Sequence, residues 1–167
     1  MNVIYETKEE MTFIGFHTKI GVNEGYQKCP EFWDKEYSEK YARLWQTMKS
    51  ENALEKALLE NGVGSFAICA DDKDGFDYWI AGLYKGGEVP DGLELFKFPA
   101  GNWAMFRTKG AMPEALQTLN TAVWKEWMPT EGKRRGANVM ATLEVYSAGN
   151  PKSADYECGI WVPVAGE

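Results

Sequence analysis

The sequence contains a single histidine, His17, and only three cysteines, Cys29, Cys69 and Cys158, which lie far apart. It has no C-x-x-C pair, and one histidine with scattered acids provides neither a Ser-His-Asp arrangement nor the usual donors of a transition-metal site. We therefore expect no metal ion and no cofactor. An odd number of scattered cysteines is typical of buried thiols in a reducing compartment, not of a disulfide framework.

Long apolar runs and an excess of basic residues are also missing. No segment approaches the ~18 apolar residues of a membrane-spanning helix, and the N-terminus lacks the basic and apolar regions of a signal peptide. The net charge is −7, whereas nucleic-acid binding requires Lys and Arg to neutralise phosphates. The one basic cluster, at 133–135, lies in a loop bounded by glycines. We expect a cytoplasmic protein that contacts neither nucleic acid nor a membrane directly.

Aromatic side chains, by contrast, are abundant: the 167 residues include 7 Trp, 8 Tyr and 8 Phe. Indole and phenol rings combine a large apolar area with a polar tip, so this many rings can fill a core and also line a pocket. The surplus favours a binding site for a small molecule.

The order of predicted elements repeats along the chain. The first half has a strand-like segment at 11–20, a helix that begins near Pro30, and strands at 65–70 and 77–84. The second half has strands at 93–98 and 102–108, a helix that begins near Pro113, and strands at 139–146 and 156–164. The sequence therefore predicts one domain, 1–167, made of module one (about 1–85), a linker (about 86–92) and module two (about 93–167).

Strands outnumber helices, and the paired strands have short connections. This pattern predicts an α+β fold in which an antiparallel sheet carries its helices on one face. A dipeptide shared by the last strands, Asp77-Tyr78 and Asp155-Tyr156, supports the repeat.

Prolines mark the expected helix ends. Pro30 and Pro113 suit a first helical turn, where a missing N–H costs nothing, and Pro129 is expected to end the second helix. A short extra helix is predicted at 52–61, ended by Gly62.

Glu144 is the most informative candidate for a functional residue. Strand alternation places it on one face with Thr142 and Tyr146. Trp161 joins them if the polar face of the last strand coincides with this one. The pattern is equally compatible with a face that is simply exposed to water, so alternation alone leaves the role of Glu144 open.

Four short motifs resemble those of one family. The run FPAGNWAMFR (98–107) resembles "I-P-A-G-x-Y-A-V-F" of the GyrI-like small-molecule-binding domains. The same superfamily includes the effector-binding domains of AraC-type and MerR-type multidrug regulators. EWMP (126–129), LEVY (143–146) and IWVP (160–163) match the later motifs of that family in the same order. No helix-turn-helix pattern is apparent, so the sequence predicts a stand-alone form.

The resemblance implies two strand-helix-strand-strand modules, related by a pseudo-two-fold axis, around a ligand groove. The characteristic acid of the family maps onto Glu144, which in multidrug sensors meets a cationic ligand at the base of an aromatic pocket. Pseudo-symmetry adds candidate wall residues, for each of which core packing is the alternative: Phe16, Trp33, Tyr37, Trp79, Trp103 and Trp161.

The resemblance leaves three functions open. The first is binding of hydrophobic, planar or cationic small molecules. The second is hydrolysis of cyclopropane-bearing DNA-alkylating natural products, with Glu144 activating water and Tyr146 stabilising the developing anion. The third is a protein-interaction role like that of the gyrase inhibitor. The sequence does not indicate which oligomeric state the protein has.

Overall fold

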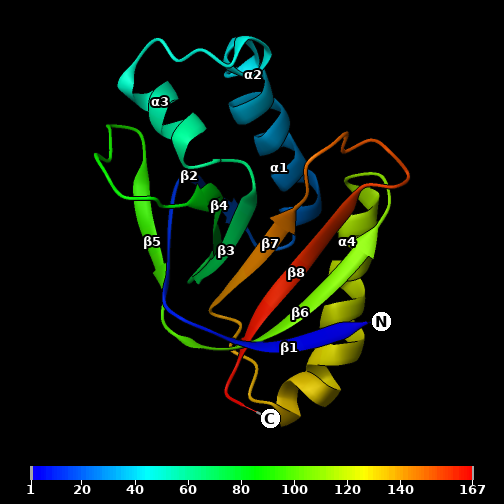
Figure 1. Ribbon diagram of the computed structural model, residues 1–167. Coiled ribbons are helices and arrows are strands. Elements are labelled where there is room, and N and C mark those ends of the chain that lie inside the picture. The colour runs from blue at the N-terminus through cyan, green and yellow to red at the C-terminus, as the bar shows by residue number, and fades with distance from the viewer. Residues whose placement is uncertain (1, 167) are drawn as a thin grey trace.

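A computed structural model describes residues 2–166, in which eight strands form one antiparallel sheet with helices packed on it (Figure 1). The expected α+β fold with an antiparallel sheet is confirmed. The strand order is β1-β6-β8-β7-β3-β4-β2-β5. The strands are β1 (Val3–Lys8), β2 (Met11–Gly21), β3 (Phe66–Asp72), β4 (Gly75–Leu83), β5 (Glu94–Phe98), β6 (Gly101–Lys109), β7 (Ala141–Tyr146) and β8 (Glu157–Val164).

Two long helical segments accompany the sheet. α1 (Gly25–Glu31) continues directly into the π-helical segment η1 (Phe32–Glu39), and α4 (Glu114–Ala122) continues into the π-helical segment η2 (Val123–Gly132). Two short helices, α2 (Ala42–Thr47) and α3 (Ala53–Glu60), follow η1. None of the helices within residues 2–166 is both long and apolar enough to cross a membrane.

Two expected helix ends were wrong. Pro30 lies inside α1, not in its first turn, and Pro129 lies inside η2, which continues to Gly132. Both prolines lie within or just before a π-helical segment, where i→i+5 hydrogen bonds replace the regular bonds that a proline interrupts. Pro113 precedes α4 at its N-cap position. The short helix was predicted correctly: the Asn52 side chain caps α3.

The edge strands are exchanged between the two halves of the chain. β1, which the sequence did not reveal as a strand, pairs with β6 of the second half, and β5 pairs with β2 of the first half. The halves join at the centre, where β3 pairs with β7. The division into modules at about 86–92 stays a prediction.

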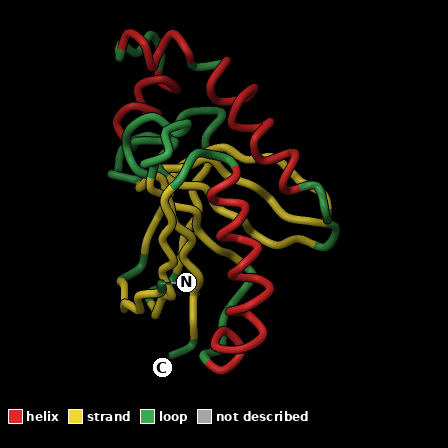
Figure 2. Tube along the Cα trace, turned by 90° about the vertical axis from the view of Figure 1, so that its right-hand side faces the viewer, coloured by secondary structure: helices red, strands yellow, loops and turns green. Residues whose placement is uncertain are grey.

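The sheet has two different faces. The helical segments lie on one side of the strands (Figure 2), where they cover two apolar clusters. The opposite face carries a separate cluster built on aromatic rings, among them Phe13, Trp79, Trp103 and the partly buried Trp161. Because side chains alternate along a strand, the register decides on which face each candidate residue lies.

Candidate ligand-binding site

A cavity of about 1390 Å³ lies over the helix-bearing face of the sheet. Its volume exceeds the roughly 300–1,000 Å³ of typical small-molecule pockets. Its walls come from both halves of the chain, since α1 with η1 lines one side and α4 the other, with β3, β4 and β7 at the floor. Its lining residues include Tyr26, Cys29, Trp33, Tyr37, Cys69, Tyr78, Gln117, Asn120, Thr142, Glu144, Tyr146 and Tyr156.

Glu144 lies on the floor of this cavity, at the junction of the two halves. In the sheet it is paired with Ala67 of β3 and with Ile160 of β8. Its Oε1 accepts hydrogen bonds from the hydroxyls of Tyr78, at 2.8 Å, and Tyr146, at 2.5 Å. The carboxylate is thus fixed by one phenol from each half of the chain.

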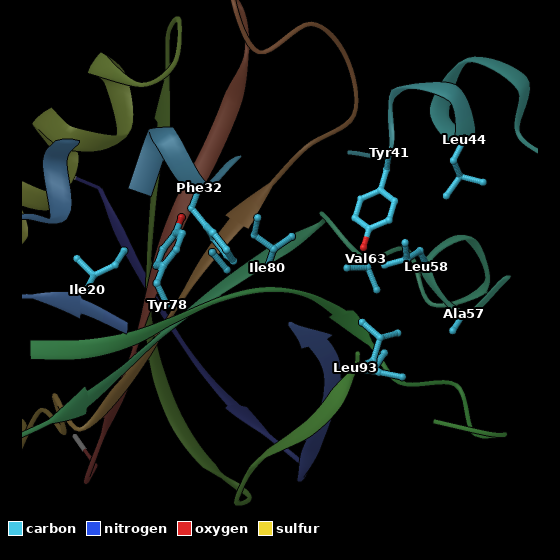
Figure 3. Packing of buried hydrophobic residues seen from close by; sticks show 12 residues of the cluster. Ile20, Phe32, Tyr41, Leu44, Ala57, Leu58, Val63, Tyr78, Ile80 and Leu93 are labelled. Atoms are coloured by element: carbon cyan, nitrogen blue, oxygen red, sulfur yellow. The ribbon is translucent and has the colours of Figure 1, made fainter. Parts of the chain in front are cut away.

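Tyr78 is itself held firmly. Its ring lies edge-on between Phe32 and Phe76, with centroid distances of 6.2 and 6.3 Å. Figure 3 shows Phe32 against the Tyr78 ring inside the first-half core. The indole Nε1 of Trp33 donates to the Tyr78 hydroxyl at 2.8 Å. A chain of hydrogen bonds therefore runs from Trp33 through Tyr78 to Glu144.

Glu144 is poorly solvated on this floor, and its surroundings shift the pKa values of the acid and of its neighbours. Burial raises the pKa of Glu144 above its ordinary value, and the hydrogen bonds from Tyr146, Tyr78 and Cys69 partly oppose this rise. Burial together with the Glu144 charge raises the pKa of Tyr78, Tyr146 and Cys69, which keeps these groups protonated as donors. Within residues 2–166 no Lys, Arg or His forms an ion pair with Glu144.

Aromatic rings form the wall beside the acid. Trp33 meets Tyr146 and Tyr37 edge-on, with centroids 5.1 and 5.2 Å apart. Phe16 stacks behind Tyr37 at 6.3 Å and does not itself line the cavity. The structure therefore brings Trp33, Tyr37 and Tyr146 together with Glu144, and places Phe16 in a supporting layer.

The three other candidate tryptophans are not brought to this cavity. Leu143, not Glu144, pairs with Trp161, so the expected convergence of Glu144, Tyr146 and Trp161 is wrong. Trp161 belongs to the cluster on the opposite face, together with Trp79 and Trp103. The physical reason is a register that the sequence does not reveal, since a shift of one residue moves a side chain to the other face.

Sequence reasoning missed Tyr78, Cys29 and Cys69 as parts of the site. A signal for Tyr78 was present in the repeated Asp-Tyr dipeptide, because Tyr78 and its counterpart Tyr156 both line the cavity. Cys29 and Cys69 had no comparable signal. In the part of the chain that the structure describes, no three His, Cys, Asp or Glu side chains are grouped so as to hold a metal ion.

The fold is that of the GyrI-like effector-binding domains, as the sequence motifs indicated. The chain belongs to the Cass2 family, described as integron-associated effector binding protein, whose sequence profile matches residues 5–164. Among curated proteins, it is similar to the transcriptional regulator BrlR of Pseudomonas aeruginosa, with 24% identity over 102 residues. That match covers 60% of this chain and 37% of the regulator, little more than a third of its length.

Solved structures share the fold across nearly the whole chain. SAV2435 bound to tetraphenylphosphonium superposes with a TM-score of 0.77 at 20% identity, covering 99% of this chain and 95% of that one. An integron cassette protein from the mobile metagenome of Vibrio cholerae gives a TM-score of 0.63 at 15% identity, covering 97% and 95%. The C-terminal domain of EcmrR gives 0.59 at 13% identity, covering 99% and 98%.

Proposed function

We propose that this protein binds lipophilic cations with an aromatic or otherwise flat apolar body in the cavity over Glu144. The observation that carries the proposal is a carboxylate on the floor of an aromatic-lined cavity, with no basic partner within residues 2–166. A poorly solvated carboxylate that lacks a cation is costly, and a bound cation removes that cost.

The rings add to the attraction. A cation near the face of an aromatic side chain gains about 0.5–2 kcal/mol for each good contact, and Trp33 and Tyr146 both lie beside the acid. The apolar body of the ligand would be buried against the same rings. The tetraphenylphosphonium bound to SAV2435 combines a positive charge with apolar rings, which supports this ligand class for a chain of the same fold.

The test is a calorimetric titration with tetraphenylphosphonium. We expect saturable binding by the native chain and a loss of about 10-fold or more in affinity for Glu144→Gln, because the variant removes a poorly solvated charge. Neutral triphenylphosphine oxide serves as the control ligand, and its weaker binding should be unaffected by the substitution. Equal affinity of the native chain and Glu144→Gln for the cation would overturn the proposal.

Hydrolysis of a strained ring is the second candidate. The observation in its favour is the raised pKa of Glu144, which suits a general base better than that of an ordinary carboxylate. Against it, the hydroxyls of Tyr78 and Tyr146 both point at Glu144 and so are not free to stabilise an anion on a substrate. Incubation with a cyclopropane-bearing alkylating compound and mass detection of a water adduct tests it, and an unchanged compound excludes that substrate.

A further inference from the structure

The two oxygens of the Glu144 carboxylate have different surroundings. Oε1 accepts the two phenol hydrogen bonds described above, from Tyr78 and Tyr146. Within residues 2–166, the only hydrogen bond to Oε2 comes from the thiol of Cys69, at 3.9 Å. A thiol is a weak donor, so one oxygen of this carboxylate is satisfied by the protein and the other lacks a strong partner.

This asymmetry distinguishes between kinds of cation. A quaternary ammonium or phosphonium ion offers charge but no N–H, so it leaves Oε2 without a hydrogen bond after it displaces water. A protonated amine offers the same charge and an N–H that donates to Oε2. Hydrogen bonds between two ionised groups are shorter and stronger than those between neutral groups, and the poorly solvated floor increases the difference.

The satisfied oxygen also limits the shape of the donor. A guanidinium or amidinium group gains its advantage by donating two parallel N–H bonds to both oxygens of a carboxylate. Here both phenols already donate to Oε1, so the second arm of such a fork would have to displace one of them. The floor therefore fits a single N–H better than a fork.

We infer that, given the proposed cation binding, the cavity is selective for protonated secondary or tertiary amines that carry an apolar aromatic body. Oε2 of Glu144 accepts the hydrogen bond from the N–H of the amine, and this bond is the source of the selectivity. Quaternary cations of the same size bind to the same place more weakly. Amidinium compounds gain nothing over the amine from their second N–H.

The test uses three naphthalene probes at a pH where the amine is protonated. They are dimethyl(naphthylmethyl)amine, its N-methylated counterpart trimethyl(naphthylmethyl)ammonium, and naphthamidine. We expect the amine to bind about 10-fold more tightly than the quaternary ion, as one charge-assisted hydrogen bond would provide. Naphthamidine should bind no more tightly than the amine. Affinities are measured by calorimetry on the full chain.

The outcomes separate this inference from the proposed function. Equal affinity for the amine and the quaternary ion would overturn the selectivity while leaving cation binding in place. Binding of neither ion would overturn the proposed function itself. Naphthamidine binding about 10-fold more tightly than the amine would show that both oxygens are available, contrary to the assignment of Oε2 as the single acceptor.

Two variants test whether the Glu144 carboxylate causes the selectivity. In Glu144→Gln, whose fold is checked by circular dichroism, the preference for the amine should disappear. Asp71→Asn is the matched control, because Asp71 is an exposed carboxylate at the cavity rim on β3. Its removal should leave the ratio of the two affinities unchanged. A ratio that falls in Asp71→Asn and persists in Glu144→Gln would overturn the inference.

Discussion

The hydroxyl of Tyr78 donates to Oε1 of Glu144 at 2.8 Å, although β4 and β7, which carry these residues, are not neighbours in the sheet. β3 lies between them and places the small side chain of Ala67 directly beside Glu144. The phenol of the first half can therefore reach across β3 to the acid of the second half. The two halves of the chain share one polar floor, so a change in either half should alter the same site.

Replacing Tyr78 by Phe should weaken cation binding at pH values around the folded pKa of Glu144. The Tyr78 hydrogen bond lowers the pKa of Glu144 against the effect of burial. Its loss therefore raises that pKa further and leaves less of the binding carboxylate form. We also expect a stability loss of about 1 kcal/mol, because Trp33 Nε1 loses its acceptor as well.

Tyr156→Phe is the matched control for this experiment. Tyr156 lines the same cavity, but its hydroxyl donates to the backbone oxygen of Ser147 and not to Glu144. Tetraphenylphosphonium titrations at several pH values should show a shifted midpoint for Tyr78→Phe and the native midpoint for Tyr156→Phe. Identical pH profiles for both variants would contradict the role given to Tyr78.

Binding of a permanently charged ligand should depend on pH through Glu144. The folded pKa of Glu144 is raised above its ordinary value of 4.5. The affinity for tetraphenylphosphonium should therefore rise as the pH increases towards the folded pKa of Glu144 and level off above it. The ligand does not titrate, so a profile that is flat in the native chain would count against Glu144 as the contact.

The same shift predicts a pH dependence of stability. A carboxyl whose folded pKa is raised contributes stability that is present below its unfolded pKa and is lost as the pH rises through its folded pKa. Glu144→Gln does not lose this contribution, so the difference in unfolding free energy between Glu144→Gln and the native chain should grow in favour of the variant over that window. Denaturant unfolding at a series of pH values measures the difference, and a constant difference would contradict the raised pKa.

Substitution by Leu should lower the ligand affinity at Trp33 and the stability of the fold at Trp161. Trp33 lines the cavity beside Tyr146, so Trp33→Leu should lower the affinity for an aromatic cation by about 10-fold through lost ring contacts. Trp161 packs on the far face at 6.4 Å from Trp103. Trp161→Leu should cost about 2 kcal/mol of stability and leave affinity unchanged. Affinity lost equally in both variants would contradict the assignment of faces.

Local patterns predicted much of the fold. The Asn52 cap and the apolar segments were readable because capping and periodicity act over a few residues, and seven of the eight strands of residues 2–166 correspond to expected segments. β1 was missed because none of its six residues at this sheet edge is buried, so the segment lacks the apolar pattern of a core strand. The helix through Pro129 was missed because π-helical hydrogen bonds leave no sequence signal. The helix through Pro30 was missed because a proline is more typical of a first turn than of a later helical position.

Only part of the site could be predicted, because local patterns do not show which strands pair over long range. Glu144 and Tyr146 followed from a family motif and strand alternation, and Trp33 and Tyr37 from the pseudo-symmetry that the resemblance implies. The structure places these four residues together. Trp161 was assigned to the wrong face because cross-strand register depends on long-range pairing, which neither strand encodes alone. The partners of the carboxylate come from strands that are distant in sequence, so no local pattern identified them.

At the mouth of the cavity, α1 and α4 approach each other through the exposed ring of Tyr26. Its hydroxyl donates to the backbone oxygen of Gln117 at 3.0 Å and accepts from Asn120 Nδ2 at 3.2 Å. The Gln117 side chain donates to the backbone oxygen of Tyr26 at 2.8 Å. All three residues line the cavity, so these bonds connect its two walls.

Removing the hydroxyl in Tyr26→Phe should let the walls separate more readily. The lost hydrogen bonds correspond to roughly 2- to 10-fold easier local opening. We therefore expect the association and dissociation rates of tetraphenylphosphonium to rise together by that factor, with the dissociation constant nearly unchanged, because the contacts at Glu144 remain. Stopped-flow tryptophan fluorescence measures both rates, and Tyr84→Phe, which loses a surface hydrogen bond to Gly87 in the linker region, is the control. Native rates in Tyr26→Phe, or a change confined to the dissociation constant, would show that these bonds do not control access to the cavity.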